Sequence, residues 1–127
     1  MRAWFLLIAF GCASTLPNVE AGSAEALYQE AQDDLENGLY PEAQAGFNDV
    51  KSKFPYSKFA ALSDLGVADT HFKRGKFLEA TDAYRAFLKY YPHHPKAAYA
   101  WLQIAEGAYE QMPEDWWFLP PSAEKDQ

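Results

Sequence analysis

Cysteine is the scarcest of the site-forming residues in this 127-residue chain, because it occurs once, at Cys12. A single cysteine cannot form a disulfide within the chain, and it cannot build a zinc site of the paired-cysteine type. Histidine is also rare, and the pair His93-His94 lies between two prolines with no third ligand nearby. This pair indicates a turn between helices rather than a metal site. We therefore expect neither a metal nor a cofactor.

Catalytic signatures are missing as well. The sequence contains no Ser-His-Asp order, no glycine-rich phosphate loop and no HExxH motif. Acid pairs such as Asp33-Asp34 and Glu114-Asp115 are present, but adjacent residues on a helix point in different directions. These pairs are typical of a solvated surface. The sequence therefore favours a protein that is not an enzyme and has no small-molecule substrate.

Basic residues are in the minority, with 11 lysines and arginines against 18 acids and a net charge of −7. Such an acidic chain is a poor candidate for binding nucleic acid. The charge is unevenly spread, since residues 20–49 hold eight acids and no base, and residues 51–96 hold nine bases and four acids. This distribution fits ordinary solvated helix faces, or alternatively a basic middle that faces an anionic partner.

The first residues form an apolar run that is too short to cross a membrane. Met1-Arg2 carries one positive charge, and residues 3–13 contain no charged side chain. Eleven residues of helix rise about 16 Å, against about 30 Å for the bilayer core. A short apolar run behind one basic residue at the N-terminus is the pattern of a secretory signal. We expect export from the cytoplasm.

The place where this signal ends has two interpretations. Ala9-Phe10-Gly11-Cys12 resembles a bacterial lipobox, in which the cysteine becomes the lipidated first residue. It implies a signal peptide over 1–11, a lipidated linker over 12–23 and a lipid anchor in the membrane. The alternative is ordinary signal cleavage after Ala21, with Val19 at the small-residue position. We favour lipidation of Cys12.

The sequence repeats itself at an interval of 37 residues. A shift by this interval superimposes glycine on glycine, proline on proline, small residues on small residues and apolar residues on apolar residues. The matched sets are Gly38 with Gly75, Tyr40 with Phe77, Ala43 with Ala80, Phe47 with Tyr84, Val50 with Phe87, Phe54 with Tyr91, Pro55 with Pro92, the triple Ala31, Ala68 and Ala105, and the triple Leu35, Phe72 and Tyr109. So many matches at one period indicate a repeat protein.

Each repeat carries the pattern of two helices. Apolar residues recur at helical spacing, and Gly38 and Gly75 follow the first helix, where a left-handed residue ends it at least cost. Pro41 suits the first turn of the following helix, and Pro55 and Pro92 end the units. Paired alanines should let the two helices approach closely. We expect the aromatic side chains at 47, 84 and 87 to fill the space between the pairs.

This combination of small contacts, aromatic second helices and terminal prolines resembles the tetratricopeptide repeat. The resemblance implies an all-α fold, a tetratricopeptide-like helical-repeat solenoid of about two and a half repeats. The units would cover 24–55, 56–92 and an incomplete 93–127. The last unit has its first helix, Pro95 to about Met112, but no second helix to cover Ile104 and Ala108. The segment Trp116-Trp117-Phe118-Leu119 would fold back as a cap, which we favour, or contact a membrane interface.

The concave face made by the first helices is the candidate binding site. Aromatic rings mixed with a few polar groups suit an extended or unfolded peptide. By repeat position this face carries Tyr28, Gln32, Leu35, Leu65, Asp69, Phe72, Tyr99, Leu102, Glu106 and Tyr109. The alternative is that Leu35, Phe72 and Tyr109 only pack one repeat on the next.

Several phrases resemble one family more closely. Phe54-Pro55-Tyr56-Ser57-Lys58-Phe59-Ala60, Tyr91-Pro92-His93-His94-Pro95 and Gln111-Met112-Pro113-Glu114-Asp115-Trp116 are similar to sequences of the BamD family, also called ComL. The resemblance covers about residues 24–127. It implies an outer-membrane lipoprotein that faces the periplasm and serves as a scaffold of the β-barrel assembly machinery. Its partners would be β-barrel assembly subunits and unfolded outer-membrane proteins.

Two other roles remain possible from the sequence. Family members continue through about five repeats, and the half that docks the barrel subunit has no counterpart in these 127 residues. The first alternative is a stand-alone periplasmic repeat adaptor in cell-envelope or peptidoglycan assembly. The second is an accessory module that presents substrate to a peptidoglycan-acting enzyme.

Overall fold

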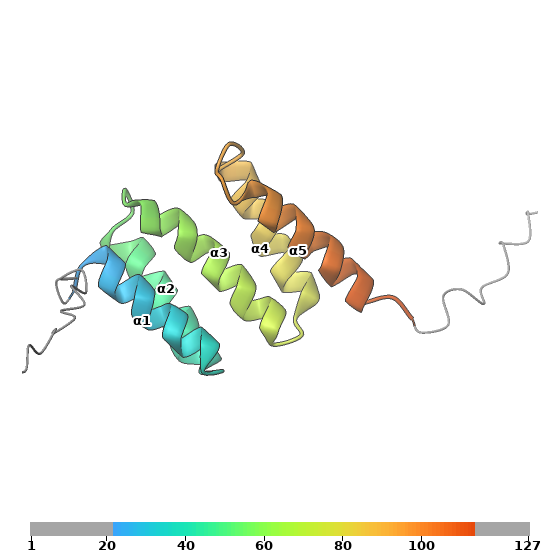
Figure 1. The fold of residues 1–127 in the computed structure, drawn as a ribbon, viewed down its shortest axis with the longest axis horizontal. Helices are drawn as coiled ribbons and strands as arrows, with labels where there is room; N and C mark the ends of the chain where they lie inside the picture. The colour runs from blue at the N-terminus through green and yellow to red at the C-terminus, as the bar shows by residue number, and fades with distance from the viewer. Residues whose placement is uncertain (1–21, 114–127) are drawn as a thin grey trace, which may run out of the picture.

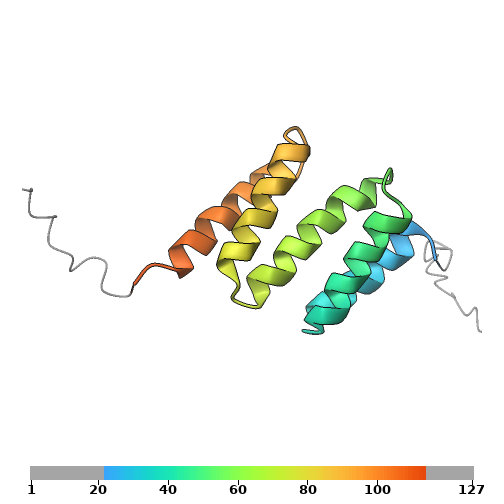
Figure 2. The same ribbon diagram turned by 180° about the vertical axis from the view of Figure 1, so that it is seen from behind.

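The computed structural model describes residues 22–113, and these form five helices. They are α1 (Ala24–Glu36), α2 (Tyr40–Lys53), α3 (Lys58–Lys73), α4 (Phe77–Tyr90) and α5 (Ala97–Glu110). Consecutive helices are antiparallel neighbours, and the pairs follow one another along the long axis of the molecule (Figure 1). The same succession is seen from behind (Figure 2). None of these five helices combines the length and apolar character needed to cross a membrane.

The helix ends follow the local sequence. Ser23 caps α1, since its hydroxyl accepts a hydrogen bond from the backbone N–H of Ala26 at 3.1 Å. Gly38 and Gly75 adopt φ angles of 77° and 72°, the left-handed conformation predicted for the end of each first helix. Pro41 lies in the first turn of α2, as predicted. The Pro92–Pro95 stretch forms the predicted turn, in which His94 Nδ1 accepts the backbone N–H of Lys96 at 3.0 Å.

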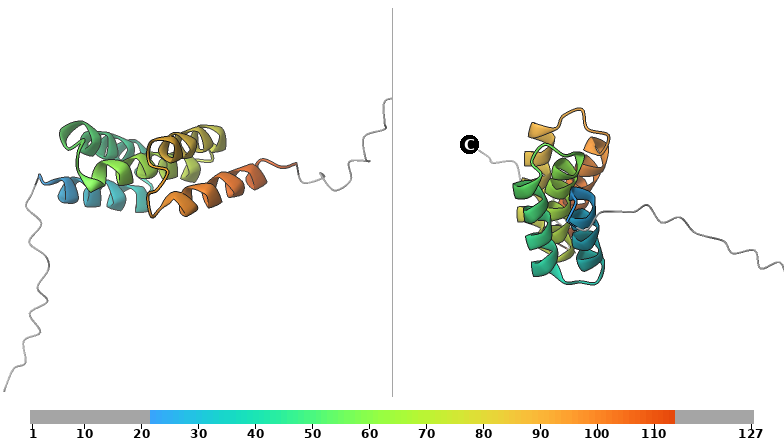
Figure 3. Two further views of the ribbon diagram at one scale, coloured as in Figure 1. Left: turned by 90° about the horizontal axis from the view of Figure 1, so that it is seen from above. Right: turned by 90° about the vertical axis from the view of Figure 1, so that its left-hand side faces the viewer.

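The helices lie along two edges of an elongated molecule. Viewed from above, α2 and α4 lie along one edge, whereas α1 and α5 lie along the opposite edge (Figure 3, left). Helix α3 packs against α2 and α4 and also touches α1. Two helix pairs and one further first helix, within residues 22–113, confirm the all-α tetratricopeptide-like fold.

The core is divided between the two repeats. One buried cluster belongs to the first pair and comprises Ala31, Leu35, Ala43 and Phe47. The other belongs to the second pair and α5 and comprises Ala61, Leu65, Ala68, Ala80, Tyr84, Phe87 and Ala100. The prediction that the aromatic residues at 47, 84 and 87 are core residues is confirmed, because each is at most 1% exposed.

Glycine allows close contacts both within and between the pairs. A Cβ on Gly46 of α2 would lie 2.8 Å from the Cβ of Ala31 on α1, so this glycine sets the spacing of the first pair. A Cβ on Gly66 of α3 would lie 2.5 Å from the Phe47 ring. The ring of the first pair therefore lies directly against the backbone of α3, and this contact joins the two repeats.

The outer side of α5 is apolar and open. Leu65 of α3 is 4% exposed, but its repeat equivalent Leu102 is 62% exposed. Ala68 is fully buried, whereas its equivalent Ala105 is exposed. Trp101 and Tyr109 extend this surface, with exposed fractions of 61% and 66%.

One expectation about α5 was only half right. Ala108 is exposed, as predicted for the bare side, but Ile104 is half-buried and packs against the cluster of the second pair. Ile104 lies on the helix face that meets this cluster, and therefore it needs no further helix to cover it. The proposed cap, Trp116-Trp117-Phe118-Leu119, lies outside the described residues, as does Cys12.

Candidate binding site

The three first helices converge on one small pocket of about 200 Å³. Helix α1 contributes Tyr28 and Gln32, and α3 contributes Leu62, Leu65 and Asp69. Tyr99 comes from α5, and Lys96 comes from the turn just before it. Five of the ten residues predicted for the binding face meet here, namely Tyr28, Gln32, Leu65, Asp69 and Tyr99. Residues far apart in the sequence form one concavity because the repeat places equivalent positions side by side.

Asp69 is the polar centre of this pocket. Its Oδ1 accepts a hydrogen bond from the Tyr99 hydroxyl at 2.8 Å and a second one from the Tyr84 hydroxyl. Tyr84 comes from α4 and Tyr99 from α5, so one carboxylate on α3 ties three helices together. The two tyrosine rings also meet edge to face, with their centroids 6.4 Å apart.

Burial sets the electrostatics of this cluster. It raises the pKa of Asp69 above its ordinary value, and the two tyrosine hydrogen bonds and the positive charges of Lys73 and Lys96 oppose the rise. Burial and the neighbouring carboxylate also raise the pKa values of Tyr84 and Tyr99. Both hydroxyls therefore remain protonated at neutral pH and act as donors to Asp69.

The opposite wall is held by α1. Gln32 donates a hydrogen bond from its amide nitrogen to the Tyr28 hydroxyl, one helical turn away. The Tyr28 ring packs against Phe47 and Phe59, with centroid distances of 5.8 Å and 5.4 Å. Burial raises the pKa of Tyr28, and the bond from Gln32 opposes the rise. The aromatic contacts fix the ring, and the hydroxyl remains at the pocket.

Two lining residues, Leu62 and Lys96, were not predicted from the sequence. Leu62 is the repeat equivalent of Tyr99, so the 37-residue shift contained the signal for it. Lys96 precedes α5, and its Nζ lies 5.7 Å from the centre of the Tyr99 ring. It comes from the turn, and periodicity along a helix does not reveal it. It adds a cation beside the Asp69 carboxylate.

The other five predicted residues do not line this pocket. Leu35 is buried in the core of the first pair, and Phe72 is half-buried with its ring 5.1 Å from that of Phe77. Leu35 thus packs within its own pair rather than on the next repeat, and Phe72 packs against α4. Leu102, Glu106 and Tyr109 are exposed on α5. Within residues 22–113, no three histidine, cysteine or acidic side chains come together as metal ligands would.

Comparisons with known proteins relate the chain to one family. The family described as YfiO, outer membrane lipoprotein, matches residues 20–127. Among curated proteins, an outer membrane protein assembly factor BamD of Neisseria gonorrhoeae is 36% identical over 78 residues, which is 61% of this chain and 29% of that protein. The BamD of Caulobacter vibrioides is 31% identical over 93 residues, 73% of this chain and 30% of that protein. The chain thus spans less than a third of the length of the relatives that it matches.

Proposed function

This chain belongs to the YfiO family of outer membrane lipoproteins, and we propose on that basis that it is a scaffold that binds unfolded polypeptides during outer membrane protein assembly. The similarity to BamD assembly factors supports a role in outer membrane protein assembly. The pocket between α1, α3 and α5 supports the binding mode. The client would bind in the pocket that contains Tyr28 and Tyr99, and no catalytic step is proposed.

The size of the pocket suits one large side chain of an extended client. A volume of about 200 Å³ is comparable to a single aromatic or leucine residue. Leu62 and Leu65 provide an apolar base, and Asp69 and Lys96 provide an acceptor and a donor for the client backbone. An extended segment would insert one side chain and satisfy its main-chain groups at the rim. The rings of Tyr28 and Tyr99 limit the entropy cost, because their own contacts already hold them.

The proposal includes a membrane anchor and partner subunits. Cys12 would carry the lipid and hold the repeats at the inner surface of the outer membrane, facing the periplasm. Other subunits of the β-barrel assembly machinery would be the stable partners, and unfolded outer-membrane proteins the transient ones. Client affinity should be weak, because a flexible chain loses entropy when it is ordered.

Site-specific photo-crosslinking tests the client contact. A crosslinker at Gln32 or Lys96, on opposite walls of the pocket, should capture an unfolded outer-membrane protein several-fold more than one at Gln44 or Asp82 on the second helices. Leu62→Trp should reduce capture at both pocket positions, because the indole would fill the apolar base. Equal capture at all four positions, unchanged by Leu62→Trp, would exclude this pocket as the client site.

A further inference from the structure

A second groove lies on the outer side of the first helix pair and plays no part in the proposed client pocket. It measures about 380 Å³ and is lined only by α1 and α2. Helix α3 reaches this pair from elsewhere, through contacts to Tyr28, Phe47 and Lys51. None of these three residues lines the groove, so it faces away from the rest of the solenoid. Its lining residues are Leu27, Glu30, Ala31, Asp34, Glu42, Ala45, Gly46 and Asp49.

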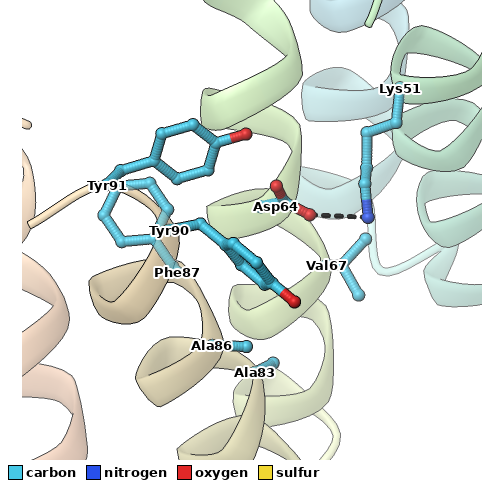
Figure 4. A pocket seen from close by; sticks show the side chains of 8 residues that line it. All are labelled: Lys51, Asp64, Val67, Ala83, Ala86, Phe87, Tyr90 and Tyr91. Carbon is cyan, nitrogen blue, oxygen red and sulfur yellow. Dashed lines mark ion pairs between the residues drawn. The ribbon is translucent and has the colours of Figure 1, made fainter.

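The second repeat has an equivalent groove with one additional wall. A pocket of about 490 Å³ between α3 and α4 is lined by Asp64, Val67, Ala83 and Ala86, which are 37 residues beyond Leu27, Glu30, Gly46 and Asp49. Here α2 supplies the third wall through Lys51 (Figure 4). The Lys51 Nζ lies 2.5 Å from Asp64 Oδ1 and makes an ion pair. In the second repeat, therefore, helix α2 of the same chain lies beside the groove and pairs a lysine with one of its acidic residues.

In the first repeat the groove is lined by four acidic side chains, which favour a positively charged ligand. Glu30 and Asp34 line one side and Glu42 and Asp49 the other. Within residues 22–113, only Asp49 of these four makes an ion pair, with Lys53 at 2.7 Å. The apolar lining between them is Leu27, Ala31, Ala45 and Gly46, and its small residues allow the backbone of another helix to approach closely. Four carboxylates around a narrow apolar base match a helix with small residues on one face and lysines or arginines beside them.

The chain itself is a poor source of that helix. Residues 1–21 contain a single base, Arg2, so they cannot neutralise four carboxylates. A second copy could present the basic residues of its α3 or α4. However, contact between the N-terminal end of one copy and the middle of another is heterologous and gives open-ended association rather than a closed dimer. A helix of a different protein would fill the groove without such open-ended association, so we infer a different protein as the occupant.

We propose that the outer groove of α1 and α2 is a docking surface for a basic helix of a partner protein. The partner helix takes the place that α2 has in the second repeat and extends the solenoid at its N-terminal end. Its cations pair with Glu30, Asp34 and Glu42, and its small residues lie on Ala45 and Gly46. This groove shares no lining residue with the pocket that contains Tyr28 and Gln32, so it leaves that pocket free for the client.

The test uses an alanine-based helical peptide with lysines on one face as the probe, and a glutamate version of it as the comparison. Titration calorimetry with the full 127-residue chain in a neutral detergent measures binding. The lysine peptide should bind and the glutamate peptide should not. Added salt should weaken the binding, because the charges at the rim are exposed to solvent. A wild-type chain that does not bind the lysine peptide overturns the proposal.

Two matched triple variants separate the groove from the general negative charge. The first, Glu30→Gln with Asp34→Asn and Glu42→Gln, neutralises the groove. The second, Glu25→Gln with Asp33→Asn and Glu36→Gln, removes the same three charges from exposed positions of α1 outside it. The groove triple should weaken binding of the lysine peptide about tenfold, and the control triple about twofold or less. Equal losses overturn the proposal.

A steric variant tests the same surface with its charges intact. Ala45 is exposed and lines the groove, so Ala45→Trp should fill it without disturbing the core. Binding of the lysine peptide should be lost, whereas helix content by circular dichroism and photo-crosslinking of clients at Gln32 should not change. Unchanged peptide binding by Ala45→Trp contradicts docking in the groove. Salt-dependent self-association of the wild-type chain that the groove triple abolishes would show that a second copy is the occupant and would also overturn the proposal.

Discussion

At the scale of single residues, Asp69 shows how the fold and the pocket depend on one group. A carboxylate in a half-buried position is costly unless it is paired. Here the Tyr84 and Tyr99 hydroxyls donate to it from two other helices. These bonds orient Tyr99 at the pocket and hold the start of α5 against α3. The free-energy cost of burying the Asp69 carboxylate is thus opposed by the two hydrogen bonds that it accepts from the tyrosines.

Asp69 should make stability depend on pH. Its pKa in the folded protein lies above the ordinary value of 3.8, so the folded state holds the proton more tightly than the unfolded chain. Below that ordinary value both states are protonated. As the pH rises through the folded pKa, ionisation opposes folding and stability is lost. Wild type should therefore lose stability relative to Asp69→Asn between about pH 3.8 and neutral pH, measured as the free energy of unfolding in urea. A relative gain over this range would mean that the tyrosine bonds outweigh burial.

Phe87 provides a test of the repeat register. It lies on α4, packs toward α3 and the turn before α5, and is 1% exposed. Its ring centroid lies 5.3 Å from that of Tyr91 and 5.2 Å from that of His94. Truncation of a buried aromatic residue typically costs about 3–5 kcal/mol. Phe87→Ala should therefore lower the free energy of unfolding by about this amount. Lys89→Ala, two residues further on the exposed face of the same helix, should change it by about 0.5 kcal/mol or less. Similar unfolding midpoints for the two variants would contradict the register.

At the scale of helices, α3 and α5 show that neighbours decide burial. Both carry a leucine followed by an alanine at equivalent positions, yet these residues are buried in α3 and exposed in α5. Helix α4 covers the face of α3 through Ala80 and Tyr84. No helix within residues 22–113 covers the same face of α5. Repeat arrays need a cap at such an end.

The segment that follows α5 should supply that cap. Trp116 and Trp117 begin only four residues after Met112, and each residue of an extended chain spans about 3.3–3.6 Å. The exposed face of α5 that they would cover includes Trp101 and Tyr109. We expect Trp116→Ser with Trp117→Ser to lower the melting temperature and to increase self-association, measured by circular dichroism and by sedimentation. An unchanged, monomeric double variant would instead favour a membrane contact for these tryptophans.

At the scale of the whole molecule, the solenoid separates three surfaces. The proposed client pocket lies among the first helices, the acidic groove lies on the outer side of the first pair, and the exposed face of α5 lies at the other end of the described residues. Two core clusters joined through Phe47 and Gly66 keep these surfaces at fixed distances. The two grooves share no lining residue, so the proposed client and the proposed partner would not compete for one surface.

The proposed attachment of the protein to a membrane would depend on Cys12. One acyl chain binds a membrane only marginally, whereas the several chains of a bacterial lipoprotein give stable anchoring. Cys12→Ser should therefore move the protein from the membrane fraction to the soluble periplasmic fraction. The intact mass of the mature wild-type chain should show an acylated cysteine at its N-terminus. A mature chain without lipid that begins at Gly22 would show ordinary signal cleavage instead.

Local and periodic features were determined by the sequence alone. Glycine at 38 and 75 ended the first helices because few other residues adopt a positive φ cheaply. The apolar stripes at 43, 47 and 50 and at 80, 84 and 87 identified the core, because helical spacing places them on one face. The 37-residue period then fixed the order of the helices, since equivalent units stack in the same way. The phrases shared with the BamD family pointed to the same family as the comparison.

Only the tertiary structure decided which residues of the predicted face form a site. Leu35, Phe72 and Tyr109 are equivalent by repeat position, but their surroundings differ. Leu35 is covered by the core of its own pair, whereas no helix within residues 22–113 covers Tyr109. Lys96 reaches the pocket from a turn, where no period applies. The double role of Asp69 requires hydroxyls 15 and 30 residues away in the sequence. Periodicity encodes the face of a helix, whereas a pocket depends on distances between helices, and packing alone sets those distances.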